Sequence, residues 1–327
     1  MNGLPAPLTR GHYTHEIQLG NQHDVHALAV AAVPVGSTVL DVGCADGSLS
    51  RHLIERGCRV IGIDVDDVSL KEAARVISET YRVDLMSDLD AQLISLMDTL
   101  GNRRFDVILA MDVLEHVIDS SAVLRSLVHN CLAAHGRVVI SVPNVAHGAV
   151  RLALLSGRFD YRPAGLLDES HLRFFTRDSI HALLGTVGLK SIASISVGRE
   201  LHDTEISVNL DDVAGHVIET VRDDPDSFTY QHFLVAVPIE LSEAGSVELY
   251  SLVKSANELA TREAARREFA AAELESTAVQ KLLQNRVAEL EATVSELHRS
   301  ETWRIGFAIT QPVRFARRFG QRIFRSH

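Results

Sequence analysis

Short apolar runs alternate with amphipathic stretches between about residues 37 and 143. The apolar runs read "STVLDVG", "CRVIGID", "YRVDL", "FDVILAMD" and "GRVVISVP". Amphipathic stretches with helical spacing lie at Leu49–Arg56, Val68–Glu79 and Ala122–Leu132. Strands that alternate with helices predict a parallel sheet covered on both faces. "VVISV" is apolar throughout, as expected of a strand buried on both sides.

The α/β pattern continues beyond residue 143 with longer interruptions. We expect residues 144–175 to form a loop-rich cap over the acceptor. A helix then begins at Thr176 or Asp178, and Gly188 is placed to end it. Two more strands, "KSIASISV" and "TYQHFLVAVPI", flank an acidic insertion, "LDDVAGHVIETVRDD", that we expect to be helical. The sheet should therefore contain seven strands.

The stretch from 243 to 300 has a different composition, rich in Ala, Glu, Leu, Arg and Gln, which favour helix. Leu283, Leu290 and Leu297 recur every seven residues, with valines between them. Leu and β-branched residues in these positions are typical of a two-stranded parallel coiled coil, and predict a homodimer. Because the heptads are few, a long helix packed on the main domain remains the alternative.

The final residues, 301–327, form a basic and aromatic tail. From Thr302 onward the tail holds six arginines, no acidic residue and four phenylalanines. If Pro312 opens a helix, Phe315 and Phe319 share one face with arginines along its flank. Such a helix favours an anionic membrane surface, contacted through residues 303–327. The alternative is a helix that docks on the acidic body of the same protein.

The predicted fold class is therefore α/β. It is a Rossmann-like, doubly wound, mostly parallel seven-stranded sheet followed by a C-terminal α-helical coiled coil. The predicted domains are a helical lead-in (1–36), the α/β domain (37–240), the coiled coil (243–300) and the basic tail (301–327).

Composition narrows the functional classes. A net charge of −11 argues against a nucleic-acid partner, because phosphate binding needs basic surface. The three cysteines have no paired spacing, so we expect neither a disulfide framework nor a zinc site. The first residues lack the apolar core of a signal peptide, and no 18-residue apolar run exists. We therefore expect a cytoplasmic protein, with the tail allowing peripheral attachment to the inner face of the membrane.

The stretch "VLDVGCADGSLS" (39–50) reads as a strand, a glycine turn and the start of a helix. A dinucleotide site would have GxGxxG, but here only Gly43 and Gly47 are present, and acids lie at Asp41 and Asp46. Two carboxylates would repel a pyrophosphate. They would favour a cationic sulfonium, so this turn predicts S-adenosylmethionine (SAM) as the cofactor and argues against an NAD-dependent dehydrogenase.

Further candidates follow the other strands. Asp64 ends the second strand, where a carboxylate can accept ribose hydroxyls. Asp84 is expected to end the third strand and to face the adenine amino group. Met111 and Asp112 end the fourth, although Asp112 can alternatively cap the next helix. The complete predicted cofactor set is Asp41, Gly43, Cys44, Ala45, Gly47, Asp64, Val65, Asp84, Leu85, Met111 and Asp112.

Five motifs in this order resemble the class I SAM-dependent methyltransferases. They are "VLDVGCADG", "VIGIDVD", "FDVILAMDVLEHV", "GRVVISVPNVAH" and "GLLDESHLRFFT". The match spans about residues 37–190 and is nearest to the small-molecule and glycan O-methyltransferase branch. The resemblance implies that Asp41 and the 43–47 backbone hold the methionine end of SAM, with Asp64 on the ribose. One departure is "GCADG" where many relatives have "GCGTG".

A hydroxyl acceptor must lose its proton during methyl transfer, usually to His, Asp or Glu. The candidates are Glu115, His116, His147 and His171, which follow strand ends or lie in the cap. His171 and His116 are the predicted catalytic residues. Cys44 is more simply a packing residue than a nucleophile. Since no group has metal-ligand spacing along the sequence, we expect a metal-independent reaction.

The acceptor is predicted mainly from the C-terminus. The tail is similar to those of bacterial polysaccharide-assembly transferases, so the leading interpretation is O-methylation of a sugar or glycan in cell-surface polysaccharide biosynthesis. One alternative is a small-molecule methyltransferase acting on a quinone, polyketide or lipid intermediate. The other is an inactive methyltransferase-like coiled-coil scaffold.

Overall fold

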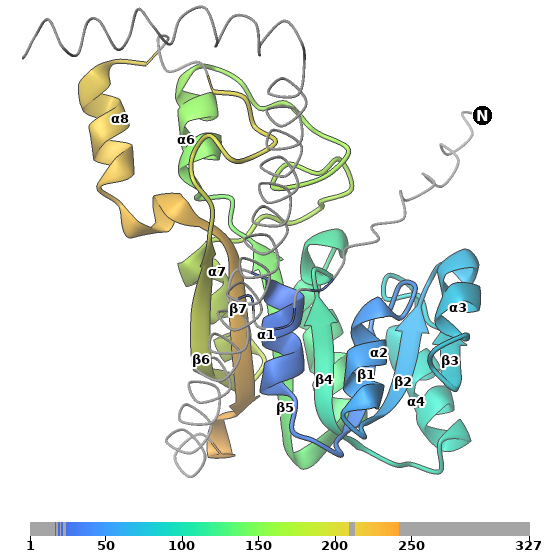
Figure 1. Ribbon diagram of the computed structural model, residues 1–327. Helices are drawn as coiled ribbons and strands as arrows, with labels where there is room; N and C mark the ends of the chain where they lie inside the picture. The colour runs from blue at the N-terminus through green and yellow to red at the C-terminus, as the bar shows by residue number, and fades with distance from the viewer. Residues whose placement is uncertain (1–16, 18, 20, 22–23, 209–212, 242–327) are drawn as a thin grey trace, which may run out of the picture. The chain divides into compact units, whose positions relative to one another are not determined.

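The structure is a computed structural model, and it describes residues 17, 19, 21, 24–208 and 213–241. These residues form an α/β domain around one seven-stranded sheet (Figure 1). The strands are β1 Thr38–Val42, β2 Arg59–Asp64, β3 Glu79–Arg82, β4 Phe105–Met111, β5 Leu132–Pro143, β6 Leu189–Gly198 and β7 Thr229–Pro238. Their order in the sheet is β3-β2-β1-β4-β5-β7-β6.

Strands β1 to β5 pair in parallel, and β7 is antiparallel to both of its neighbours, β5 and β6, so six of the seven strands point in one direction. The central strands are buried on both faces because helices cover both sides of the sheet. This confirms the predicted Rossmann-like, mostly parallel seven-stranded sheet.

The α-helices are α1 Val25–Ala32, α2 Ser48–Glu55, α3 Asp67–Ala73, α4 Leu89–Thr99, α5 Ser120–Cys131, α6 Gly148–Leu155, α7 Arg177–Thr186 and α8 Gly215–Arg222. Short 3-10 helices lie at Leu114–His116 (η1), Pro225–Phe228 (η3) and Ile239–Leu241 (η4). Side chains of Asp24, Asp66, Asp88 and Asp119 accept hydrogen bonds from amides in the first turns of α1, α3, α4 and α5. Thr176 forms a capping box with Ser179, so α7 is opened by Thr176, the first of the two predicted starts, and not by Asp178.

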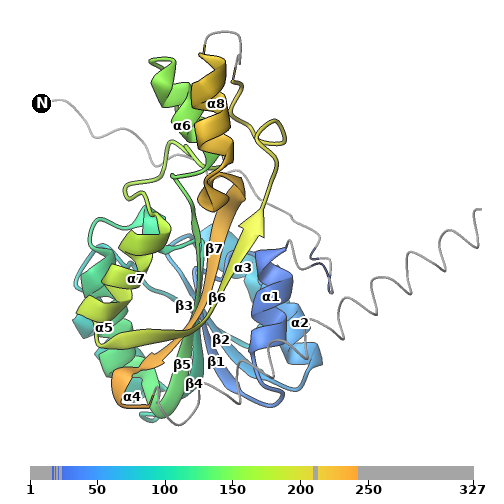
Figure 2. The same ribbon diagram turned by 90° about the vertical axis from the view of Figure 1, so that its left-hand side faces the viewer.

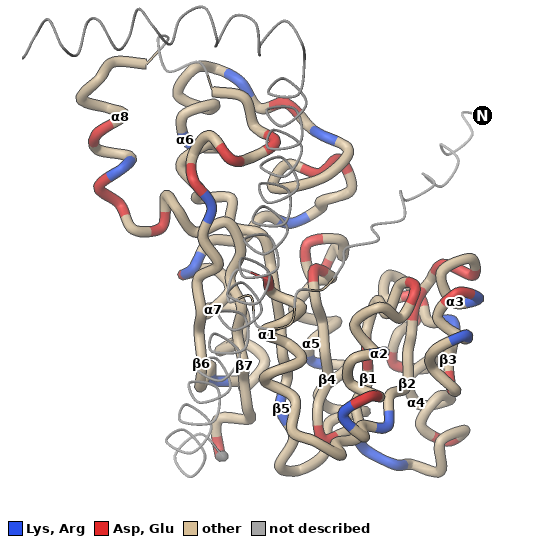
Figure 3. Tube along the Cα trace, in the orientation of Figure 1, with Lys and Arg blue, Asp and Glu red and all other residues tan. Residues whose placement is uncertain are grey.

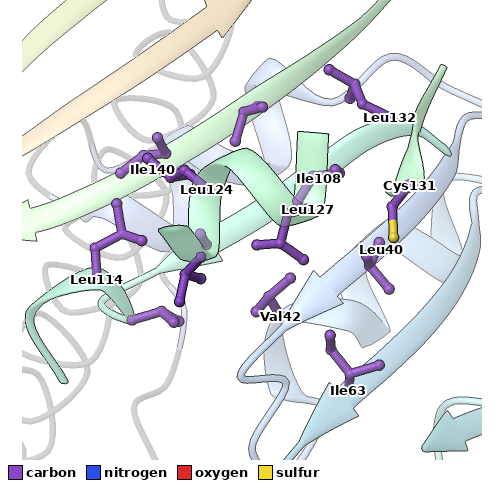
Figure 4. Close-up of a cluster of buried hydrophobic side chains, with 14 of the residues drawn as sticks. Leu40, Val42, Ile63, Ile108, Leu114, Leu124, Leu127, Cys131, Leu132 and Ile140 are labelled. Carbon is purple, nitrogen blue, oxygen red and sulfur yellow. The ribbon is translucent and has the colours of Figure 1, made fainter. Parts of the chain in front are cut away.

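Two apolar layers sandwich the sheet. Figure 2 shows α1 and α2 on one face of the sheet and α4, α5 and α7 on the other. The larger layer packs α5 side chains such as Leu124 and Leu127 against Leu40, Ile108 and Ile140 of the strands (Figure 4). All five of these side chains are fully buried. This core holds the carboxyl ends of the strands at fixed positions, and the candidate site lies there.

Several sequence-based boundaries need correction. The third strand was expected at 81–85 but ends at Arg82, because the chain turns towards α4 directly afterwards. The helix expected at Val68–Glu79 ends at Ala73. The region 144–175 is loop-rich, as expected, and additionally contains α6, which packs against α8. Helix α4 was not predicted.

The predicted coiled coil (243–300) and basic tail (301–327) lie outside the described residues, as does most of the lead-in before α1. Within the described part of the chain, no helix is both long and apolar enough to cross a membrane.

Candidate functional site

The candidate site lies where the carboxyl ends of β1, β2 and β4 meet. Strand β1 pairs with both neighbours, so that Val42 is in register with Ile63 of β2 and with Ala110 of β4. The loops after these strands therefore share one edge of the sheet, and acidic positions lie in the loops that follow β2 and β4 (Figure 3). In open α/β sheets this edge is where ligands bind.

The glycine turn (residues 43–47) reverses the chain between β1 and α2. Gly43, Ala45 and Gly47 all have left-handed backbones, with φ of 70°, 47° and 78°. A Cβ at Gly43 would lie 2.9 Å from Cγ2 of Val113, so no side chain fits there. Gly43 and Ala45 are nevertheless solvent-exposed. The turn thus offers open backbone to which a ligand can approach closely.

Asp41 lies on β1 directly before the glycine turn. Its carboxylate is buried and accepts a hydrogen bond from Oγ of Ser50 on α2 at 2.6 Å. Burial raises the pKa of Asp41 to about 6, the Ser50 hydrogen bond opposes this rise, and the negative charge of Asp64 adds to it. No cationic side chain is among the groups that shift this pKa, so a positively charged ligand could stabilise the Asp41 carboxylate.

Asp64 ends β2 and is fastened to the glycine turn. Its carboxylate accepts the backbone N–H of Ala45 at 3.1 Å and that of Asp66 at 2.9 Å. Each carboxylate oxygen has a second lone pair, so Asp64 keeps capacity for the hydroxyls of a ribose. The structure thus brings the two predicted acids, Asp41 and Asp64, to the same turn.

Cys44 has its side chain on the inner side of the turn. It is buried against Leu70, Ala73 and Ile77. Burial is the largest cause that raises its thiol pKa far above the ordinary value. Cys44 is therefore a packing residue with an unreactive thiol, and only its backbone is available to a ligand.

The predicted adenine-side residues follow β2 and β3. Val65 is 36% exposed, and the Val83 amide donates to the Asp64 carbonyl at 2.9 Å, which keeps the two strand ends together. Asp84 lies two residues beyond β3, and its carboxylate accepts the amide of Met86 at 2.9 Å. Leu85 packs against the main core. The sequence-based placement of Asp84 at the strand end was therefore wrong, although Asp84 still lies at the same edge of the sheet.

Met111 ends β4 and is buried, as predicted. Asp112 follows with φ of 52°, a left-handed value that costs a non-glycine residue energy. Its Oδ1 accepts hydrogen bonds from Oγ of Ser141 at 2.7 Å and Nε2 of Gln231 at 2.9 Å. The Asp112 side chain is held by β5 and β7, so the alternative in which it caps the next helix is wrong.

Three titratable side chains meet where η1, the 3-10 helix after β4, contacts the cap region. Glu115 and His116 belong to η1, and His171 comes from the cap region. The carbonyl of Glu115 accepts the amides of Leu172 at 2.7 Å and Arg173 at 3.0 Å, which joins the two segments. The ring centres of His116 and His171 are 4.9 Å apart. We call Glu115, His116 and His171 the histidine cluster.

His147 has a structural role instead. It is fully buried, its Nδ1 accepts the amide of Ala149 at the start of α6, and its Nε2 lies 3.1 Å from the carbonyl of Arg199. Both ring nitrogens are therefore used within the fold. Burial is the largest cause that lowers its pKa. Among the four candidate proton acceptors, His147 is the one that the structure removes from the site.

Sequence reasoning missed the residues that hold these groups in place. Ser50 contacts Asp41, Ser141 and Gln231 hold Asp112, and Ser170 contacts His116. Two of them had a usable signal, because Ser50 ends the stretch "VLDVGCADGSLS" and Ser170 lies within the "DESH" motif beside His171. Ser141 and Gln231 are common polar residues on strands that only the folded sheet brings close to Asp112.

The site can be tested against a SAM-type cofactor. It supplies open backbone at the glycine turn, a buried carboxylate at Asp41, and a second carboxylate at Asp64. This donor set suits a ligand with a positive charge and a ribose, whereas Asp41 beside the turn and Asp46 within it make it unsuited to a pyrophosphate. The residues present therefore fit the cofactor predicted from the sequence.

Comparisons with known proteins define the class. The family model described as "Methyltransferase domain" matches residues 13–194 of this chain. The chain belongs to this family, and it is a SAM-dependent methyltransferase of class I.

Named relatives give a finer comparison. The ubiquinone biosynthesis O-methyltransferase of Pseudomonas paraeruginosa is 31% identical over 181 residues, which is 51% of this chain and 76% of that protein. The Idiomarina loihiensis protein of the same name is 30% identical over 163 residues, or 48% of this chain. The match spans 63% of that relative, which is less than two thirds of its length.

A crystal structure of magnesium protoporphyrin IX methyltransferase from Synechocystis PCC 6803 with bound SAH is also similar, at a TM-score of 0.43 and 21% identity. The similarity covers 67% of this chain and 84% of that one.

Proposed function

We propose that this protein transfers the methyl group of SAM to a hydroxyl oxygen of a small-molecule acceptor. The observation that carries the proposal is the histidine cluster, which lies at the same sheet edge as the glycine turn. Groups that accept protons or bind oxygen are needed where a hydroxyl acts as the nucleophile, because its proton must be lost. The relatives named above are O-methyltransferases, which supports oxygen as the methylated atom.

In this proposal the glycine turn, Asp41 and Asp64 hold the cofactor, with Val65, Asp84 and Met111 beside it. The bound cofactor supplies a methyl group already activated by its sulfonium, and the protein contributes alignment. Asp112, fixed by Ser141 and Gln231, separates the cofactor residues from the histidine cluster along the chain. His171 and His116, the predicted catalytic residues, act on the acceptor side.

A glycan acceptor is the second candidate. The basic, aromatic sequence of residues 301–327 supports it, because such a segment favours an anionic membrane where lipid-linked glycans are presented. In this second proposal, the coiled coil predicted for residues 243–300 joins two copies of the chain. The relatives' names favour the small-molecule acceptor, so we place the glycan second.

One experiment tests the function and separates the acceptors. Purified full-length protein is incubated with SAM labelled in its methyl group and with phenols, vicinal diols, nucleotide sugars, or lipid-linked glycans in anionic vesicles. Label in a phenol or diol supports the leading proposal, whereas label only in a glycan overturns it in favour of the second.

Variants assign the acceptor side. We expect His171→Ala and His116→Ala to lower turnover at least tenfold while the SAM-induced rise in melting temperature stays, since that rise depends on cofactor binding alone. Unchanged turnover in both variants would contradict the assignment. Absence of any SAM-induced stabilisation in the unaltered protein would favour an inactive scaffold.

A further inference from the structure

The histidine cluster combines two imidazoles and one carboxylate. Each of the three residues offers a ligand atom, and these atoms all lie within 4.8 Å of one another. The residues were not recognisable as a group in the sequence, because His171 lies in the cap region, beyond Ser170, which is itself 54 positions from His116. The expectation that no metal-ligand set exists was therefore based on spacing along the chain, and folding brings such a set together.

Glu115 gives the first independent indication of a ligand. Its side chain is 1% exposed, and its Oε2 has no hydrogen-bond partner. A buried carboxyl oxygen without a partner is costly, and a bound cation is one of the few groups that offset this cost.

The two histidines are oriented by hydrogen bonds at the ring nitrogen Nδ1. Nδ1 of His171 lies 3.3 Å from the carbonyl of Leu166, which can only accept. Nδ1 of His116 lies 3.1 Å from Oγ of Ser170, whose own hydrogen is donated to Asp168 at 2.6 Å. Both rings therefore carry their hydrogen on Nδ1 and a lone pair on Nε2. Metal-bound histidines are held in this way by a carbonyl or carboxylate behind the ring.

The ring separation agrees with a shared ion. With a metal–nitrogen distance of about 2.1 Å, each ring centre lies about 3.2 Å from the ion, so two rings are about 4.5 Å apart at a right angle and about 5.2 Å apart in a tetrahedron. The observed 4.9 Å lies between these values. Two atoms bound to one ion can be at most about 4.2 Å apart. The three ligand atoms, which lie within 4.8 Å of one another, therefore have to move closer together by roughly half an ångström or more when the ion binds.

We propose that Glu115, His116 and His171 bind one divalent first-row transition-metal ion, with Zn²⁺ or Co²⁺ preferred over Mg²⁺. Imidazole nitrogens favour these metals, whereas Mg²⁺ prefers oxygen ligands. Three protein ligands leave a coordination position open, as in catalytic rather than structural metal sites. The ion's role rests on the proposed function: it would take the acceptor hydroxyl oxygen as a further ligand and lower that hydroxyl's pKa. The binding itself does not depend on that function.

The test measures metal binding directly. Full-length protein is stripped with a chelator, dialysed, and titrated with Zn²⁺, Co²⁺ or Mg²⁺ while bound metal is measured by mass spectrometry. Glu115→Gln keeps the shape of the side chain but removes its charge, and His171→Ala removes one imidazole. The matched control is His135→Ala. His135 is an exposed histidine on β5, so this variant measures how much metal is bound adventitiously by surface histidines.

We expect one tight Zn²⁺ per chain in the unaltered protein and in His135→Ala, and at least 100-fold weaker binding in the two cluster variants. Equal binding in all four proteins, tighter binding of Mg²⁺ than of Zn²⁺, or no tight binding at all would overturn the proposal. If a variant fails to fold, the unaltered protein loaded with Co²⁺ provides the deciding measurement. The proposal requires visible ligand-field absorption bands from the bound Co²⁺, and these bands must disappear when Zn²⁺ displaces the Co²⁺.

The outcome is separable from that of the proposed function. SAM-induced stabilisation and methyl transfer by the metal-free protein would keep the methyltransferase assignment while removing the ion. In that case a histidine takes the acceptor proton itself. Metal binding without transfer to any hydroxyl acceptor would keep the ion and reject the acceptor class.

Discussion

The two halves of the site are built in different ways. On the cofactor side, Asp41 and Asp64 are held by a serine and by backbone amides within about twenty residues of the glycine turn. On the acceptor side, η1 and the cap region are joined by hydrogen bonds to the Glu115 carbonyl, and Asp112, which lies between the two sides, is held from β7, 119 residues away. The cofactor side is thus local in sequence, and the acceptor side depends on the complete domain.

This difference indicates which distant segment of the chain supports the acceptor side. Gln231, which holds Asp112, lies on β7, the strand that directly follows η3. Arg177 of α7 pairs with Asp226, and Arg151 of α6 pairs with Asp224, so two arginines anchor the segment that leads into β7. A change in this segment should reach Asp112 and the acceptor side, and leave Asp41 and Asp64 in place.

The largest effect is expected for Asp64→Ala. The substitution removes the acceptor of two backbone N–H groups and the proposed ribose ligand, and hydrogen bonds to a charged group contribute about 1.5–3 kcal/mol each. We expect SAM affinity to fall about 100-fold, as measured by calorimetric titration. Asp67→Ala, whose side chain is 70% exposed, is the control and should bind SAM normally. Equal affinity in both variants would place the ribose elsewhere.

A smaller effect is expected from pH. Burial raises the pKa of Asp41 to about 6, so the carboxyl becomes protonated as the pH falls through about 6 in the free protein. A cationic ligand needs the carboxylate, and SAM affinity should therefore fall by up to about tenfold per pH unit below that value. In Asp41→Asn the affinity should be low and nearly independent of pH between 5 and 7. A pH-dependent affinity that persists in this variant would assign the titration to another group.

The smallest effect is expected for Arg177→Ala. The ion pair with Asp226 is partly exposed, so its loss should lower the free energy of unfolding by only about 1 kcal/mol. The Arg177 hydrogen bond lowers the pKa of Asp226, so this stability is present above the ordinary pKa of an aspartate and is lost as the pH falls through the lowered value. Chemical denaturation at neutral and acidic pH measures both. SAM affinity should not change, and a loss of affinity would contradict the separation of the two halves.

The meeting of Asp41 and Asp64 at the glycine turn could be predicted from the sequence, whereas the grouping of the histidine cluster could not, for the same physical reason. Asp41, Gly43, Gly47 and Asp64 follow predictable strand ends, so their meeting point follows from parallel pairing alone. His116 and His171 were selected singly. Their grouping with Glu115 depends on how the cap region folds over η1, for which no periodic pattern exists. Helix α4 was missed although Leu89, Leu93 and Leu96 have helical spacing.

The left-handed alanine in the glycine turn has a consequence for engineering. Ala45 adopts φ of 47°, a conformation that costs an alanine about 1–2 kcal/mol and costs a glycine nothing. A glycine there would remove that cost but would also give the unfolded chain more freedom, by about 0.4–1 kcal/mol. The first term is the larger, so a glycine at position 45 should make the fold more stable, by up to about 1.5 kcal/mol. The alanine therefore keeps a stiffer entrance to the cofactor site at a modest cost in stability, and a glycine would exchange that stiffness for a slightly more stable fold.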